Sequence, residues 1–98
     1  MITSKQRSFL RGLAQTTDTT VYIGKYGLTE NVVREIDIGL EHRELVKVKL
    51  QEGAELDPKE VAGQMAEKLG AEFVQAIGRK FVLFRESKDY KQIELPRK

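Results

Sequence analysis

The sequence of 98 residues contains no cysteine and a single histidine. The lack of cysteine excludes a disulfide framework, a thiolate nucleophile and the cysteine-rich kind of zinc site. The one histidine, His42, lies between Glu41 and Arg43 near the end of an expected helix, and no serine nucleophile accompanies it in a recognisable motif. We therefore expect no catalytic residues, no bound metal and no cofactor.

Long apolar runs are also missing. The longest, Phe81-Val82-Leu83-Phe84, is far short of the ~20 residues that a membrane-spanning helix requires. The first residues, Met1 to Lys5, lack the apolar stretch of a signal peptide. We expect a soluble, cytoplasmic and monomeric protein with no membrane partner.

An excess of one charge is absent too, because the formal net charge is only +2. The charges are unevenly placed, however. Residues 1–28 carry four basic and one acidic side chain and residues 79–98 carry seven and three, whereas residues 50–78 carry two and six. This asymmetry fits a domain with one side that faces a polyanion. A chance imbalance on an evenly solvated surface fits it equally well.

Cap residues and apolar spacing predict three helices. The first covers about residues 5–15, with Ser4 as its N-cap and one apolar face. The second follows the N-cap Thr29 and ends near His42, and the third begins at Asp57-Pro58 and ends before Gly70. The apolar face of the first helix contains Phe9, Leu10, Leu13 and Ala14.

Four strands are predicted at about residues 21–23, 45–50, 73–77 and 81–85. The second alternates apolar and basic residues, so Val46, Val48 and Leu50 should face the core while Lys47 and Lys49 face away together. The last two strands are joined tightly through Gly78-Arg79. The order α-β-α-β-α-β-β implies one α/β (α+β) domain over residues 1–98, with a four-stranded mixed sheet packed with helices. The polar tail, about residues 87–98, is expected to be loosely held.

The most informative segment is Gly24-Lys25-Tyr26-Gly27, which lies between a strand and a helix that starts at Thr29. Glycine allows positive φ and close approach of another backbone, and the first N–H groups of a helix attract anions. Lys25 adds a cation, and Tyr26 adds a ring on which a base could stack. This pattern favours a phosphate clamp comparable to the G-x-x-G loop of KH domains. An ordinary strand-to-helix turn remains an equal alternative.

Other basic residues extend the candidate surface. Lys47 and Lys49 should lie together on one strand face, with Tyr22 beside them if the helices cover only the other face. Arg79 and Lys80, with Arg85, form a basic cluster at the final hairpin. A solvated strand face and a basic turn that aids solubility are the competing interpretations. Lys5, Arg7 and Arg11 on the first helix are expected to be solvated.

Several stretches resemble the CRM (chloroplast RNA splicing and ribosome maturation) domain in its stand-alone bacterial form, the YhbY-like proteins. They are residues 5–7, 10–14, 23–29, 40–49 and 77–85, and they include the G-x-x-G loop. The resemblance implies a fold similar to the C-terminal domain of bacterial translation initiation factor three. It also implies an RNA-binding protein, not an enzyme, that associates with precursors of the large ribosomal subunit.

From the residues and the resemblance together, we expect a ribosome assembly factor that binds ribosomal RNA in the pre-50S particle by shape and backbone. The predicted contacts are Gly24, Lys25, Tyr26, Gly27, Thr29, Lys47, Lys49, Arg79 and Lys80. The main alternative is a protein-docking module on the ribosome that makes no direct contact with RNA.

Overall fold

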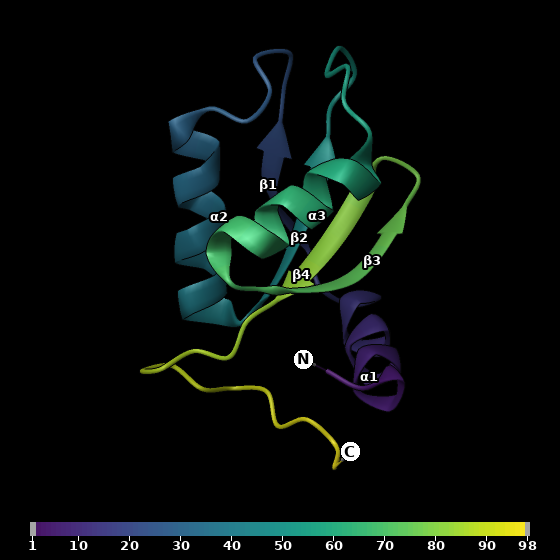
Figure 1. Cartoon of the computed structure of the whole chain (residues 1–98), viewed down its shortest axis with the longest axis vertical. Helices are drawn as coiled ribbons and strands as arrows, with labels where there is room; N and C mark the ends of the chain where they lie inside the picture. Colours follow the sequence, from purple (N-terminus) through teal and green to yellow (C-terminus); the bar gives the residue numbers. More distant parts are fainter. Residues whose placement is uncertain (1, 98) are drawn as a thin grey trace.

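The computed structural model describes residues 2–97. Seven elements follow one another along the chain (Figure 1): α1 (Ser4–Ala14), β1 (Thr19–Ile23), α2 (Glu30–Arg43), β2 (Leu45–Leu50), α3 (Pro58–Leu69), β3 (Glu72–Ile77) and β4 (Lys80–Phe84). The predicted order α-β-α-β-α-β-β is confirmed. Within the described part, no helix is long and apolar enough to span a membrane.

The four strands form one mixed sheet in the order β1-β2-β4-β3. β1 and β2 are parallel, and β4 is antiparallel to both of its neighbours, β2 and β3. This arrangement confirms the predicted mixed sheet and leaves β1 and β3 as its edges. It also brings three connections to one end of the sheet, namely residues 24–29, 51–57 and 78–79 (Figure 1). We call this end the loop end.

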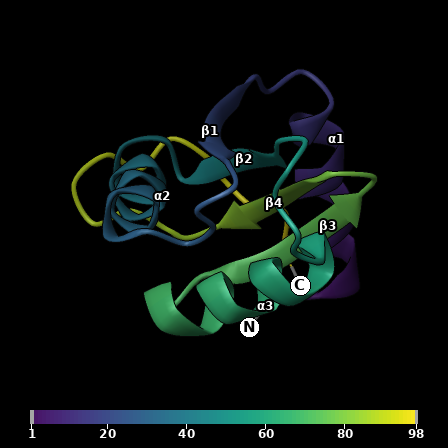
Figure 2. The same ribbon diagram turned by 90° about the horizontal axis from the view of Figure 1, so that it is seen from above.

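Helices cover both faces of the sheet, but not equally. α2 and α3 pack on one face and α1 on the other (Figure 2). The core beneath α2 and α3 is the larger one and includes Ile23, Ile36, Leu40, Val46, Val48, Val61, Met65, Phe81 and Leu83. The core beneath α1 is smaller and consists of Leu10, Ala14, Leu45, Val74, Val82 and Phe84. None of the smaller core lies at the loop end, so α1 leaves that end of its sheet face uncovered.

The helix caps follow the predicted chemistry with one correction. The Thr29 hydroxyl accepts from Val32 N at 3.2 Å, and the Asp57 carboxylate accepts from Lys59 N at 3.4 Å. The first helix, however, is capped by Thr3 instead of Ser4. Thr3 and Gln6 form a reciprocal capping box, which places the helix one residue earlier than predicted.

The apolar face of α1 also differs from the prediction. Gln6, Leu10 and Ala14 are buried, whereas Phe9 is 40% exposed. These three buried residues are spaced by four, which makes a narrower stripe than the four predicted apolar residues. The Gln6 side chain can lie in the interface because its amide donates to Pro96 O at 2.9 Å.

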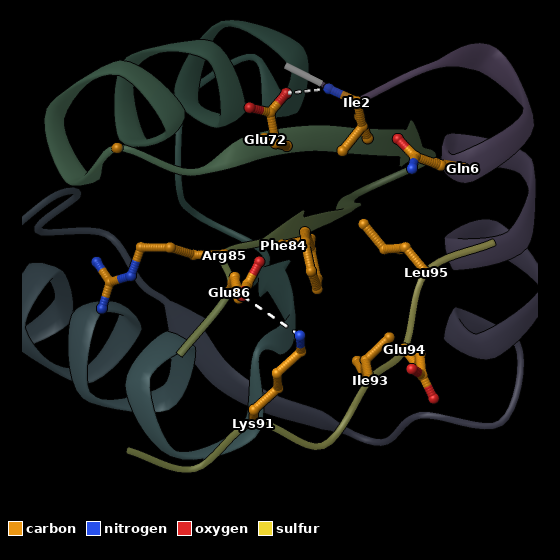
Figure 3. A pocket seen from close by; sticks show the side chains of 11 residues that line it. Ile2, Gln6, Glu72, Phe84, Arg85, Glu86, Lys91, Ile93, Glu94 and Leu95 are labelled. Carbon is orange, nitrogen blue, oxygen red and sulfur yellow. Dashed lines mark hydrogen bonds and ion pairs between the residues drawn. The ribbon is translucent and has the colours of Figure 1, made fainter. Parts of the chain in front are cut away.

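The C-terminal segment, residues 86–97, is attached to the domain, so the expectation of a loosely held tail was wrong. Ile93 and Leu95 pack against the smaller core. A pocket of about 480 Å³ remains beneath the segment, and Figure 3 shows Leu95 and Ile2 lying around Phe84 at this pocket. Residue 98, the last of the predicted tail, lies outside the described residues.

Candidate nucleic-acid interface

The loop between β1 and α2 points outward. Gly27 N donates to Gly24 O at 3.0 Å, which closes a tight turn with Lys25 and Tyr26 at its tip. Both tip side chains are exposed, and Tyr26 is 80% exposed. The Lys25 ammonium lies 5.2 Å from the centre of the Tyr26 ring. The turn therefore presents a cation and an aromatic ring to the surroundings.

The two glycines of the loop have different roles. Gly27 has a φ of +71°, the left-handed region that favours glycine. Gly24 does not have positive φ, which corrects the idea that both glycines are needed for backbone freedom. A Cβ at Gly24 would lie 3.4 Å from Gln51 Oε1, an ordinary contact with the end of a flexible side chain, so steric space does not require glycine there. The turn geometry depends mainly on Gly27.

The start of α2 leaves backbone donors next to this turn. Thr29 accepts from Val32 N through its side chain and from Val33 N through its carbonyl. No acceptor among residues 2–97 is found for Glu30 N and Asn31 N, the first N–H groups of the helix. Such groups, with the positive end of the helix dipole behind them, attract phosphate oxygens. The described carboxylates do not occupy this position.

A row of exposed side chains crosses the uncovered end of the sheet beside this loop. Tyr22 is paired with Lys49, Lys49 with Lys80, and Lys80 with Ile77. The row spans about 14 Å, at roughly 4.8 Å between neighbouring strands. All four side chains are exposed, with Tyr22 at 50% and Ile77 at 67%. The two lysines make no ion pair with any described residue. We call these four residues the sheet row.

Two predicted contacts are instead engaged inside the protein. The Lys47 ammonium donates to Ala14 O at 2.9 Å and so binds the carboxyl end of α1. The Arg79 guanidinium donates to Leu50 O, Gln51 O and Ala54 O at 3.3, 3.1 and 2.8 Å. Sequence reasoning could not separate these two residues from Lys49 and Lys80, because all four look like surface cations in the sequence.

Arg85 does not join a basic cluster at the final hairpin. It lies at the opposite end of β4, where its guanidinium bonds to the Asp37 carboxylate at 2.7 Å and to Leu69 O at 2.9 Å. This arrangement ties the end of α3 to α2. Arg85 is therefore a structural residue, distant from the loop end.

The role of Arg79 can be tested by a substitution that keeps its charge. Lysine cannot reproduce the planar set of donors, so Arg79→Lys should lower the free energy of unfolding by about 1–2 kcal/mol in urea denaturation. Lys80→Arg is the matched control, because Lys80 is exposed and unbonded, and it should change stability little. A loss of RNA affinity in Arg79→Lys without any loss of stability would contradict the structural assignment.

The described residues do not assemble a metal-binding cluster. No group of three or more histidine, aspartate or glutamate side chains between residues 2 and 97 is placed to hold a metal ion. The His42 ring stacks on Tyr90, with the ring centres 4.7 Å apart, at the C-terminal segment. At the loop end, the turn of residues 24–27 and the sheet row expose cations, aromatic rings and backbone donors, which suits binding of an anionic polymer, whereas the connection of residues 51–57 exposes the carboxylates of Glu52, Glu55 and Asp57.

Comparisons with known proteins identify a family and relatives that are named as RNA-binding. Residues 2–85 match the model of the CRS1/YhbY (CRM) domain family. The chain is 41% identical over 96 residues to the probable RNA-binding protein YqeI of Bacillus subtilis, covering 98% of this chain and 100% of the relative. It is 42% identical over 98 residues to an RNA-binding protein of Haemophilus influenzae, covering 99% and 97%. The solution structure of a hypothetical protein from Staphylococcus aureus, 46% identical, superposes with a TM-score of 0.81 over 98% of this chain and 100% of that one.

Proposed function

The chain belongs to the CRS1/YhbY (CRM) domain family, and from this premise we propose that it binds RNA, specifically ribosomal RNA in precursors of the large ribosomal subunit. The loop of residues 24–27 and the sheet row together form the proposed interface. The protein would act as a monomeric assembly factor in the cytoplasm. Relatives in Bacillus subtilis, Haemophilus influenzae and Methanocaldococcus jannaschii, 36–42% identical to this chain, are named as RNA-binding or probable RNA-binding proteins.

One observation carries the proposal. Lys49 and Lys80 lie directly opposite each other on neighbouring strands, exposed and in no ion pair with a described residue, although Glu52 lines the same surface hollow as Lys49. Like charges at directly opposed positions of an antiparallel pair destabilise a sheet. A sheet selected for stability alone would not favour this pair. A polyanion placed across the two ammonium groups would turn the repulsion into attraction.

The geometry suggests recognition by backbone and stacking instead of base sequence. Phosphate oxygens would bind the Glu30 and Asn31 N–H groups and the Lys25 ammonium. Bases could stack on Tyr26 and Tyr22, since aromatic stacking accepts every base. Lys49 and Lys80 would bind the next phosphates along the RNA strand. Thr29 positions the donors by fixing the first turn of α2.

Salt dependence tests this assignment directly. Three free ammonium groups, Lys25, Lys49 and Lys80, predict that log K falls with log salt with a slope of about −2 on a short single-stranded RNA, at ~0.7 per phosphate. The measurement is fluorescence anisotropy of a labelled oligouridylate at several potassium chloride concentrations. The variant with Lys49→Gln and Lys80→Gln should reduce the slope to about −0.7.

The matched control is the pair Lys5→Gln and Lys68→Gln, which lowers the charge equally at exposed positions away from the loop end. It should keep the wild-type slope. An RNA affinity that does not change with salt concentration would argue strongly against phosphate contacts. Association with ribosomal particles without any affinity for naked RNA would favour the alternative of a protein-docking module.

A further inference from the structure

A groove runs along the outer edge of β3, the edge strand farthest from the loop of residues 24–27 in the strand order. It has a volume of about 590 Å³ and is lined by residues 73–77 of the strand and by Arg7, Arg11 and Lys59. The sequence alone predicts Arg7 and Arg11 as solvated side chains. The structure shows that they converge with a residue about fifty positions later in the chain.

The groove is basic and contains no acidic side chain. Arg7 and Arg11 come from α1 on one face of the sheet, and Lys59 comes from α3 on the other, so cations flank the strand edge from both sides (Figure 2). The Arg7 Nε donates to Phe73 O at 3.0 Å, which fixes that side chain along the strand. The side chains of Arg11 and Lys59 are exposed and have no partner among residues 2–97.

The position of Lys59 is unfavourable for its own helix. It lies in the first turn of α3, directly after Pro58. The positive end of the helix dipole disfavours a cation in that turn. Helix stability therefore does not explain the lysine, whereas an anion in the groove does.

We propose that this groove binds the phosphate backbone of the same RNA strand after it has crossed the sheet row. The proposal rests on the proposed function, and it adds a second contact region. Ile77 lines the groove and is also the last residue of the sheet row, paired with Lys80. Uncovered surface thus continues from Tyr22 across Lys49 and Lys80 into the groove. An RNA strand that occupies both regions contacts three more cations, Arg7, Arg11 and Lys59, than an RNA strand that occupies the sheet row alone.

An exposed strand edge could also be charged simply to prevent edge-to-edge aggregation. A peptide that extends the sheet is less suitable as a ligand, because Arg7 already occupies the outward carbonyl of Phe73. The three possibilities predict different effects of removing the groove cations. Edge protection predicts self-association, a peptide site predicts weaker peptide binding, and the RNA proposal predicts weaker RNA binding.

The test compares a short and a long RNA. Oligouridylates of ~6 and ~20 nucleotides lie near the lower end and above the upper end of the usual site sizes of single-strand binders, about 4–16 nucleotides. The long RNA should bind with a salt slope near −4, and the variant with Arg11→Gln and Lys59→Gln should reduce it to about −3. Affinity for the long RNA should fall about tenfold in that variant, while affinity for the short RNA stays unchanged.

The variant with Lys5→Gln and Lys68→Gln is again the control, because it removes one exposed cation from each of the same two helices. It should bind both RNAs like the wild type. If wild type binds neither RNA, the proposed function itself fails. If wild type binds both and the groove variant binds both equally well, the groove proposal is overturned. Concentration-dependent self-association of the groove variant by analytical ultracentrifugation, with RNA binding intact, would identify the cations as edge protection and also overturn it.

Discussion

Replacing Lys25 and Tyr26 together by aspartate is expected to weaken RNA binding by about 2 kcal/mol or more, roughly thirtyfold in Kd. The change removes the cation and the ring at the tip of the turn and puts two carboxylates where a phosphate would bind. The fold should remain intact, because both side chains lie outside the core and Tyr26 is 80% exposed. Fluorescence anisotropy with a labelled RNA and circular dichroism measure the two expectations separately.

The control for this variant must change the charge without touching the turn. Gln64→Glu with Lys68→Glu lowers the net charge by the same amount at two exposed positions of α3. General electrostatic repulsion of RNA should weaken binding slightly in both proteins, and the difference between them reports the local effect. Equal affinities in the loop variant and the wild type, with folding confirmed, would rule out the clamp.

The elements could be predicted from the sequence because their signals are local. Asp57-Pro58 fixes the start of α3 through a cap and a constrained φ, and residues 45–50 alternate so regularly that only one strand register buries the apolar side. α1 was placed one residue late because Ser4 and Thr3 are both good caps. The choice between them depends on Gln6, whose side chain also binds the distant Pro96 carbonyl.

The candidate interface could be predicted only in part, for a related reason. The loop of residues 24–27 is contiguous, so its chemistry is visible in the sequence. Lys47 and Arg79 were expected at the surface with Lys49 and Lys80, yet their partners are carbonyls 33 and 25 to 29 residues away in the chain. The groove at β3 combines helices from opposite faces of the sheet. No local pattern reports which cations a fold brings together.

One buried carboxylate accepts three of the hydrogen bonds that attach the C-terminal segment. Glu44 is 0% exposed and accepts hydrogen bonds from the backbone N–H groups of Ser87, Gln92 and Ile93 at 2.8, 2.7 and 2.7 Å. It is also the one residue other than glycine with positive φ, +67°, among residues 2–97. That conformation costs an ordinary residue about 1 kcal/mol or more. Glutamate remains favourable there because glycine would supply no acceptor for the three donors.

Glu44→Gln should therefore detach the segment and lower the free energy of unfolding by about 2–4 kcal/mol. The substitution keeps the size of the side chain but replaces one acceptor oxygen by an amide that cannot accept the N–H groups. Hydrogen exchange at the amides of Ser87, Gln92 and Ile93 should accelerate far more than exchange in β2 or β4. Glu94→Gln, an exposed carboxylate of the same segment, is the control and should leave exchange unchanged.

Lowering the pH should also detach the segment in the wild type. The direction of this pH dependence follows from the pKa of Glu44. Burial raises this pKa, but the three backbone N–H groups and the nearby Lys91 ammonium lower it more, so the pKa lies below its ordinary value of 4.5. The carboxylate thus contributes its full stability above about pH 4.5 and loses it as the pH falls through the lower, folded-state pKa. Amide exchange in the segment, corrected for its intrinsic pH dependence, should show this step in the wild type and lack it in Glu44→Gln. An identical acid response in the two proteins would mean that another group holds the segment in place.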